Sequence, residues 1–290
     1  MLFGSHISIA GGLVNAPARA AAVGCECFQI FSRSPRGGKP PAITAEVKKE
    51  FLAQCRKYNF KDWYIHTPYF INFASVKKPI RWGSIGVVRE ELERGTQIGA
   101  QAVMTHLGSA KDYGRAQSVE KVIRAVHHVL ERYTGSTLFL LEQAAGAGDI
   151  IGGTLEEFAY ILKGAEKIDK SYRNKLGICL DTCHAFAMGY DLSSKLAVNQ
   201  FIREFDKVIG LERLKVIHAN DSLFGLGEHR DRHEHIGKGK IGLKGFEALV
   251  QHKAFAHLNM ILETPKDDPK DDPRNLKILK GFRNKMKYGA

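Results

Sequence analysis

Short apolar runs, rich in β-branched and aromatic residues, recur through this sequence, and each is followed by a segment long enough for a helix. The runs are LFGSHIS near residue 5, CFQIF near 29, WYIHT near 65, AVMTHL near 105, TLFLLE near 140, GICLDTCH near 181, KVIHAND near 218 and NMILET near 262. Strands that alternate with helices are typical of a parallel sheet, and eight such units match a sheet closed into a barrel. The expected fold class is therefore α/β, a (β/α)8 TIM barrel.

The spacing of these runs indicates one repeating unit. From His66 to Glu263, successive strand ends stand about 36 to 45 residues apart. Residues 118–133 show the helical pattern expected between two strands, with Ser118 as the N-cap. One face of that helix would carry the apolar side chains Val122, Ala125, Val126, Val129 and Leu130.

The domain organisation follows from the same pattern. A chain of 290 residues is long for one domain, but it suits a barrel of this kind. No linker divides it, so we expect a single TIM-barrel domain over residues 1–290. The only low-complexity segment, PKDDPKDDP at residues 265–273, is expected to be a rigid, solvated loop before a last helix.

Composition limits the partners and the compartment. The formal net charge of +12 favours a polyanionic partner. Five cysteines are an odd number in a long chain, which argues against a disulfide framework and for a reducing compartment. No signal peptide and no apolar run of about 18 residues is present. We expect a soluble, cytoplasmic protein with no membrane partner, acting as a monomer.

Six of the eight apolar runs end in a side chain that can bind a metal ion. The carboxyl ends of barrel strands meet at one rim, so these side chains would come together despite their separation in sequence. Partly buried carboxylates and imidazoles are costly unless they are paired or coordinated, and six together are therefore hard to explain without a ligand. The six are His66, His106, Glu142, Asp181, His218 and Glu263.

Two local motifs add further candidate ligands. In LDTCH, His184 follows Asp181 by three residues just beyond a strand, and in DRH, Asp231 and His233 are two residues apart and face the same side of an extended chain. Imidazole nitrogens with carboxylate oxygens suit Zn²⁺. Nine candidates are too many for one zinc, so two or three metal ions are implied, with Glu142 as the natural bridge of a closely spaced pair. The chemistry of such a pair is in-line displacement at phosphorus.

Other residues that could bind metal have a simpler interpretation. Cys179 and Cys183 are expected to be core or turn residues, because cysteine ligands would favour a closed structural site. His6, inside the first apolar run, is expected to pack in the barrel or to support a ligand rather than to bind metal itself.

Three stretches carry a resemblance to a known family: HTPYFINFA (residues 66–74), GICLDTCH (residues 177–184) and HANDSLFGLGEHRDRHEHIGKGKIG (residues 218–242). Through these, and through SHISIAGGL and ILETP near the two ends, the sequence resembles the endonuclease IV family of zinc-dependent apurinic/apyrimidinic (AP) endonucleases. The resemblance implies a hydrolase of the deoxyribonuclease IV type. It would cleave double-stranded DNA 5′ to an abasic site, leaving a 3′-hydroxyl and a 5′-deoxyribose phosphate, and would also clean 3′ ends.

The resemblance also assigns ligands to three Zn²⁺ ions and a role to two carboxylates. One group would be His66, His106 and Glu142; the second Glu142, Asp181, His218 and Glu263; the third His184, Asp231 and His233. A hydroxide activated by zinc would attack phosphorus, with Glu142 and Glu263 as the catalytic carboxylates that manage its proton.

DNA contacts are implied in the same way. Arg36, Tyr69 and Phe70 would enter the duplex at the lesion, with Arg36 contributing more than Arg33. The phosphate backbone would pass the basic residues of the third stretch, Arg230, Arg232, Lys238 and Lys240. At two positions the sequence differs from the family pattern in a way that bears on DNA binding. Leu223 stands where family members usually carry lysine, and Gly38 where they usually carry a larger residue.

Two alternative functions are consistent with part of the pattern. An isomerase of the xylose isomerase type also gathers Glu, Asp and His on a barrel rim, but such sites lean towards carboxylates with Mg²⁺ or Mn²⁺, whereas five of the nine candidates here are histidines. A non-catalytic DNA-binding protein with structural zinc would be expected to use cysteine ligands.

Overall fold

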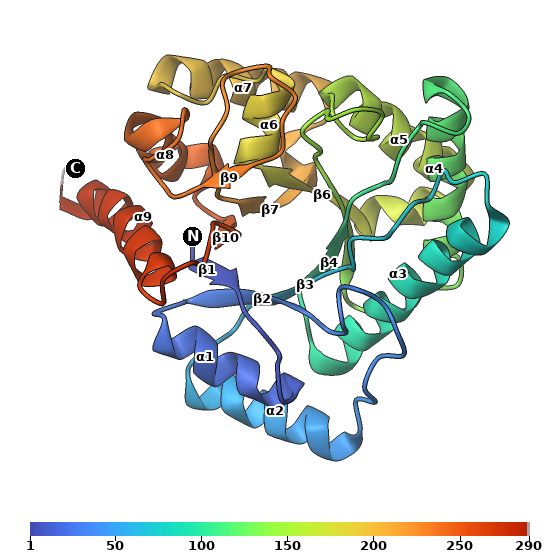
Figure 1. The fold of residues 1–290 in the computed structure, drawn as a ribbon, viewed down its shortest axis with the longest axis horizontal. Coiled ribbons are helices and arrows are strands. Elements are labelled where there is room, and N and C mark those ends of the chain that lie inside the picture. Colours follow the sequence, from blue (N-terminus) through green and yellow to red (C-terminus); the bar gives the residue numbers. More distant parts are fainter. Residues whose placement is uncertain (289–290) are drawn as a thin grey trace.

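The structure, a computed structural model that describes residues 1–288 and side chains as far as residue 285, confirms the expected barrel (Figure 1). In this part of the chain, eight parallel strands close in the order β1-β10-β7-β6-β5-β4-β3-β2. Their bounds are β1 Phe3–His6, β2 Cys27–Phe31, β3 Trp63–His66, β4 Ala102–Thr105, β5 Leu138–Glu142, β6 Leu176–Asp181, β7 Leu214–His218 and β10 Asn259–Leu262. Because all eight run the same way, their carboxyl ends share one rim.

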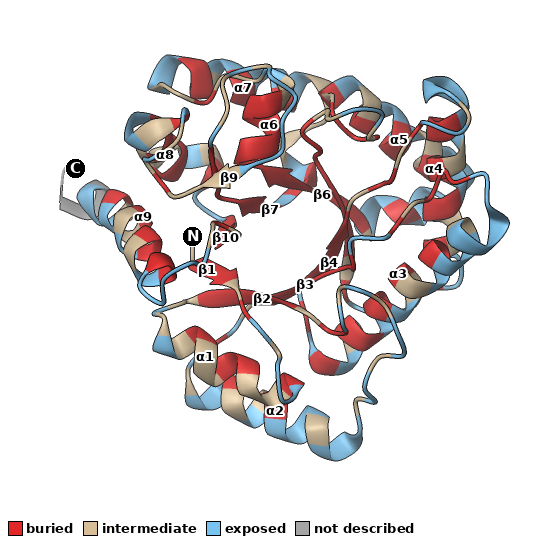
Figure 2. Cartoon of the chain, viewed as in Figure 1, coloured by how far each residue is buried: buried red, intermediate tan, exposed pale blue. Residues whose placement is uncertain are grey.

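Helices surround the barrel as an outer layer (Figure 1). Their barrel-facing sides are buried and their outer sides exposed, as Figure 2 shows by colour. The α-helices are α1 Ala16–Ala22, α2 Ala45–Lys57, α3 Lys78–Ile98, α4 Arg115–Leu130, α5 Leu155–Ile168, α6 Thr182–Met188, α7 Lys195–Val208, α8 Gly242–Gln251 and α9 Asp271–Tyr288. Short 3-10 helices are η1 Leu13–Asn15, η2 Lys170–Asn174, η3 Leu211–Arg213 and η4 Lys253–Phe255.

Helix α4 begins earlier than the sequence suggested. Its N-cap is Gly114, and no side chain caps it. Ser118 lies inside the helix, where its backbone N–H already donates to the carbonyl oxygen of Gly114. The prediction that Ser118 caps the helix is therefore wrong, although the apolar face of α4 was predicted correctly and is buried.

The segment PKDDPKDDP is only partly a loop. Helix α9 begins at Asp271, so residues 271–273 form its first turn. Asp271 accepts a hydrogen bond from Arg274 at 2.7 Å, and Asp272 accepts one from Lys266 at 2.7 Å. Both aspartates are buried. The expected loop therefore covers residues 265–270 alone, because the second pair of acids is used to start the helix.

The interior of the barrel is filled below the rim by a compact apolar layer. It consists of Cys27, Tyr64, Ala102, Met104, Leu140, Cys179, Val216 and Ile261. A much larger apolar cluster lies between the strands and the helices. The polar strand ends thus rest on a packed core that does not depend on them.

A two-stranded antiparallel hairpin, β8 Asp221–Ser222 with β9 His233–Glu234, follows β7 and lies at the rim (Figure 1). It pairs Asp221 with Glu234 and Ser222 with His233. Among residues 1–288, no helix has both the length and the apolar character needed to cross a membrane.

Candidate metal centre

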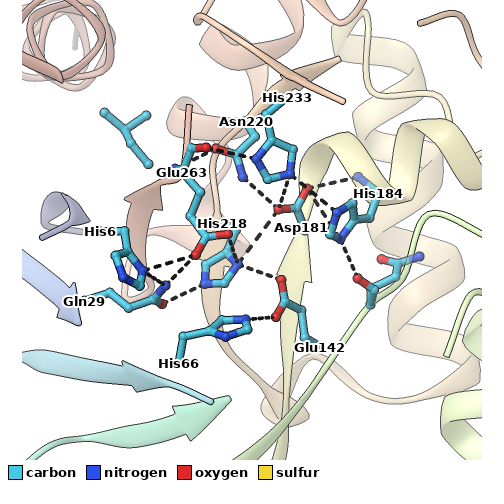
Figure 3. Close-up of polar contacts among 12 residues, drawn as sticks. His6, Gln29, His66, Glu142, Asp181, His184, His218, Asn220, His233 and Glu263 are labelled. Atoms are coloured by element: carbon cyan, nitrogen blue, oxygen red, sulfur yellow. Dashed lines mark hydrogen bonds and ion pairs between the residues drawn. The ribbon is translucent and has the colours of Figure 1, made fainter. Parts of the chain in front are cut away.

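The structure brings all nine predicted ligands together at the carboxyl-terminal rim (Figure 3 shows seven of them). Four are the last residues of barrel strands and two directly follow a strand, while His184 lies in the first turn of α6. Asp231 and His233 belong to the β8–β9 hairpin. A cavity of about 420 Å³ opens above them, lined by His6, His66, Tyr69, His106, His184, Asp231, His233, Glu263, Thr264 and Lys266.

The first group lies at the ends of β3, β4 and β5. Nε2 of His66 lies 2.6 Å from Oε2 of Glu142, and Nε2 of His106 lies 3.7 Å from the same oxygen. One ligand atom from each residue falls within 4.8 Å of the other two. A single metal ion could therefore contact all three.

The second group surrounds His218 at the end of β7. Its Nδ1 lies 2.9 Å from Oε1 of Glu142, 3.3 Å from Oε2 of Glu263 and 3.8 Å from Oδ2 of Asp181. Glu142 thus directs one carboxylate oxygen to each of the first two groups. This is the arrangement of a bridging carboxylate.

The third group lies nearer the solvent. Nε2 of His184 lies 3.1 Å from Oδ1 of Asp231 and 3.4 Å from Nε2 of His233, and His233 lies 3.7 Å from the same aspartate oxygen. His184 is buried, whereas the side chain of Asp231 is 52% exposed. The hairpin therefore covers a buried histidine with two further ligand candidates.

Backbone carbonyl groups fix the orientation of three of these imidazoles. Nδ1 of His66 donates to the carbonyl oxygen of Thr67 at 2.7 Å, and Nδ1 of His184 donates to that of Gln143 at 2.7 Å. Nδ1 of His233 donates to the carbonyl oxygen of Glu263 at 3.0 Å. A carbonyl can only accept, so each ring carries a proton on Nδ1 and directs its Nε2 at the carboxylates.

His218 is oriented by a side chain instead. Its Nε2 donates to Oε1 of Gln29 at 2.8 Å, which leaves the Nδ1 lone pair facing Glu142, Asp181 and Glu263. Gln29 in turn donates to Oε1 of Glu263 at 2.6 Å. One amide therefore orients both a histidine and a carboxylate of the second group.

These contacts require a cation between each imidazole and its carboxylate, either a proton or a metal ion. Burial alone would raise the pKa of Glu142, but His106, His218 and His66 hold that pKa well below its usual value. Burial would lower the pKa of His184, but Asp181 and Asp231 outweigh it and raise that pKa to about 10. The protein thus surrounds these imidazoles with negative charge that a bound metal ion could balance in place of a proton, and this mixed nitrogen and oxygen donor set fits Zn²⁺.

Asn220 and Gln29 support the ligands, although neither was predicted from the sequence to do so. Asn220 donates from Nδ2 to Oδ2 of Asp181 at 2.7 Å and accepts from the backbone N–H of Glu263 at 2.8 Å. His6 contacts Gln29 and, at 3.5 Å, Oε1 of Glu263, which agrees with the supporting role expected for it. Gln29 carried a signal, because it is a polar residue in the middle of the apolar run CFQIF.

Two cysteines lie near the centre. Cys179 falls in ligand range with Glu142 and His218, and Cys183 with Asp231 and His233. Both are buried, and burial raises the pKa of Cys179 to about 12. As neutral thiols they act as apolar core groups, which agrees with the expectation from the sequence.

Of the residues predicted to enter DNA, Tyr69 lines the cavity, and Phe70 follows it in the chain. Tyr69 is 71% exposed and Phe70 is 43% exposed, so neither is a core residue. The ring of Tyr69 packs edge-on against Phe31 at 5.2 Å. Arg36 is exposed on the loop of residues 32–41, while Arg33 is buried and paired with Glu91.

The basic residues of the third stretch are exposed, and Arg230 and Arg232 lie between strands β8 and β9. The guanidinium of Arg230 stacks on the ring of Phe224 at 3.6 Å, and Arg232 holds the hairpin through its carbonyl oxygen, which accepts from the N–H of Leu223. Leu223 and Gly38 are both exposed, so each departure from the family pattern falls on the surface.

The fold and the rim define a class: barrel proteins whose carboxyl-terminal rim gathers histidines and carboxylates in adjoining metal-competent groups. The family model described as "Xylose isomerase-like TIM barrel" matches residues 17–284. The probable endonuclease 4 of Aquifex aeolicus (strain VF5) is 39% identical over 280 residues, which are 96% of each chain. The crystal structure of endonuclease IV from Thermus thermophilus matches with a TM-score of 0.85 and 31% identity, over 98% of this chain and 100% of that one. The chain belongs to the endonuclease IV family.

The same barrel is also found in sugar-converting proteins. A D-tagatose 3-epimerase-like protein matches with a TM-score of 0.73 at 20% identity, over 100% of this chain and 99% of that one. At that identity the likeness shows the fold alone, so function has to be argued from the site.

Proposed function

We propose that this protein is a zinc-dependent AP endonuclease that hydrolyses the phosphodiester 5′ to an abasic site in double-stranded DNA. It leaves a 3′-hydroxyl and a 5′-deoxyribose phosphate, and it also cleans blocked 3′ ends. Family membership supports the proposal, and so does the net charge of +12, which suits a polyanion. The observation that carries it is the joining of the first two ligand groups through the two oxygens of Glu142.

Three zinc ions would be held by the three groups described above, nine side chains in all. Bound zinc supplies a water of lowered pKa as nucleophile and positive charge to offset the charge that develops on the phosphoryl oxygens. The ligands already have their orientation from hydrogen bonds to Thr67, Gln143, Gln29 and the carbonyl of Glu263. A preoriented set loses little free energy to reorganisation when the metal ions bind.

The two catalytic carboxylates have different access to the cavity. Glu142 is fully buried, and both of its oxygens are engaged by histidines. Glu263 lines the cavity, and its side chain is 19% exposed. Because it reaches the cavity, Glu263 is the carboxylate that would take the proton of the attacking water, while Glu142 would hold the two metal sites in register.

DNA would lie across the cavity mouth. The exposed Arg36, Tyr69 and Phe70 stand on one side, where they can fill the space of a missing base. Arg230 and Arg232 stand on the hairpin side, where they can contact phosphates. We further propose that the chain acts as a single domain and a monomer in the cytoplasm.

The experiment that tests the proposal is metal-dependent cleavage. Metal-free protein is titrated separately with Zn²⁺, Mg²⁺ and Mn²⁺, and each sample is given a duplex with one abasic site, an intact duplex and an aldose. We expect a cut 5′ to the abasic site that saturates near three zinc ions per chain. Interconversion of the aldose with Mg²⁺ or Mn²⁺ and no cleavage would instead establish the isomerase alternative, to which the shared fold points.

A further inference from the structure

Asp221 is a fully buried carboxylate that takes no part in the three ligand groups. Its two oxygens accept hydrogen bonds from five backbone N–H groups at 2.9 to 3.4 Å. Among the described residues, no Lys, Arg or His forms an ion pair with it, so these backbone groups alone compensate its burial. The donors are Ser222, Gly237, Gly239, Ile241 and Gly242.

Four of the five donors belong to the loop of residues 237–242, which has the sequence GKGKIG. The loop wraps closely: a Cβ added at Gly239 would lie 2.5 Å from Oδ1 of Asp221 and 2.4 Å from the carbonyl oxygen of Ser222. The N–H of Lys240 donates to that carbonyl at 2.8 Å. With the backbone turned inward, the side chains of Lys238 and Lys240 are exposed.

Asp221 also belongs to the hairpin that carries the third ligand group. It pairs with Glu234, and the next residue, Ser222, pairs with His233. The same β8 residues therefore set the position of His233 and receive the GKGKIG loop. A substitution at Asp221 would therefore affect the positions of both His233 and the GKGKIG loop.

We propose that Asp221 is a positioning residue that joins the third metal-binding group to a phosphate-binding loop, residues 237–242, whose Lys238 and Lys240 contact the DNA backbone. This rests on the proposed function for its DNA part. Replacement by asparagine would turn an amide N–H₂ towards N–H groups that need an acceptor, so the loop would separate from β8.

The test compares wild type, Asp221→Asn, Lys238→Ala/Lys240→Ala and the triple variant. Binding to an abasic duplex is measured against salt concentration, and zinc is counted by elemental analysis. The double lysine variant should keep its zinc and lower the salt slope by about 1.8, since each phosphate contact contributes about 0.9. Asp221→Asn should lower the slope similarly, and the triple variant should bind no worse than the weaker of its two parents.

Asp221→Asn should also weaken zinc binding at the third site by about 10- to 100-fold, as expected for loss of a group that orients a ligand. The remaining zinc and the helical circular dichroism should not change. Additive losses in the triple variant, or an Asp221→Asn protein with full slope and full zinc, would overturn the proposal.

Gly239→Ala provides a second variant in case Asp221→Asn does not fold. It keeps the carboxylate but forces the loop away from it, so the salt slope should fall and hydrogen exchange at residues 237–242 should speed up. An unchanged slope with fast exchange would contradict the phosphate-binding role. Failure of the wild type to bind abasic DNA would refute the proposed function, whereas the positioning of His233 would still be decided by the zinc count.

Discussion

Nε2 of His218 donates to the side-chain oxygen of Gln29 across the barrel interior, at 2.8 Å. The two residues lie on β7 and β2, which are not neighbours in the barrel. Because this bond fixes the imidazole tautomer, it keeps the Nδ1 lone pair directed at three carboxylates.

We predict that Gln29→Leu weakens zinc binding although no ligand is removed. The variant leaves the Nε2–H of His218 without its acceptor and releases Glu263, so affinity at the second site should fall by about 10- to 100-fold. Competition with a chromogenic chelator measures this. Gln117→Leu, at an exposed position of α4, is the control. Equal zinc affinities in the two variants would show that Gln29 does not support the metal ligands.

His233→Ala should lose about one zinc and fold normally. The apolar barrel core does not include this residue, so the helical signal should be kept. Cleavage should fall by about 10² to 10³ in rate with a modest change in DNA affinity, because a charge-stabilising group acts mainly in the transition state. His229→Ala, exposed in the same hairpin, should behave as wild type. Full cleavage with a full metal complement in His233→Ala would mean that DRH is only a DNA contact.

Substitution of the two arginines in the loop after β2 should affect different properties, DNA binding for Arg36 and stability for Arg33. Arg36 is exposed, so Arg36→Ala should leave stability unchanged and weaken binding to abasic DNA more than to intact DNA. Arg33 is buried against Glu91, so Arg33→Ala should destabilise the fold by about 1–3 kcal/mol, because Glu91 would keep only the hydroxyl of Ser32 and the more distant Arg94 as partners. Urea unfolding and binding to both duplexes measure the difference. Equal loss on the two duplexes would reduce Arg36 to an ordinary phosphate contact.

Tyr69→Ala should keep the melting temperature of the wild type and lose discrimination for the lesion. The ring is 71% exposed, so little apolar surface is lost from the core. The variant would also lack the side chain that is proposed to insert between bases at the lesion. Differential scanning calorimetry with binding to abasic and intact duplexes tests both parts, and a large drop in melting temperature would point to packing against Phe31 instead.

Zinc binding at the third group should release a proton. In the metal-free protein the pKa of His184 is raised to about 10, chiefly because Asp181 and Asp231 outweigh burial, so the ring is protonated at neutral pH. Zinc binds only the neutral ring, and its affinity should therefore rise with pH up to about 10. Calorimetry in two buffers of different ionisation enthalpy counts the proton. Asp231→Asn should reduce the release at neutral pH, and no release from wild type would contradict the raised pKa.

The barrel and six of the nine ligand candidates could be predicted from the spacing of the strands and from their shared rim, and the other three, His184, Asp231 and His233, from the local motifs LDTCH and DRH. His66, Glu142 and His218 end apolar runs, and parallel closure necessarily brings such ends together. Ser118 was misplaced because its hydroxyl can cap a helix or lie inside one, and the chain entered α4 one turn earlier at Gly114.

The supporting contacts could not be predicted as easily. Asp221 and Asn220 act on residues 16 to 43 positions away, through loops whose path no local pattern specifies. Gln29 reaches His218 across the barrel interior, a contact that depends on the stagger of the strands. Such contacts are set by tertiary geometry, so only the polar character of Gln29 within CFQIF pointed to it.

Strands β1 and β10 are neighbours in the barrel although they hold residues 3–6 and 259–262. Glu263 directly follows β10 and is the last of the nine rim side chains to leave the ribosome. A nascent chain can therefore form neither the closed barrel nor the complete second ligand group. We therefore expect cutting activity to appear only after synthesis has passed this point, because a chain that ends before Glu263 lacks one ligand candidate of the second group.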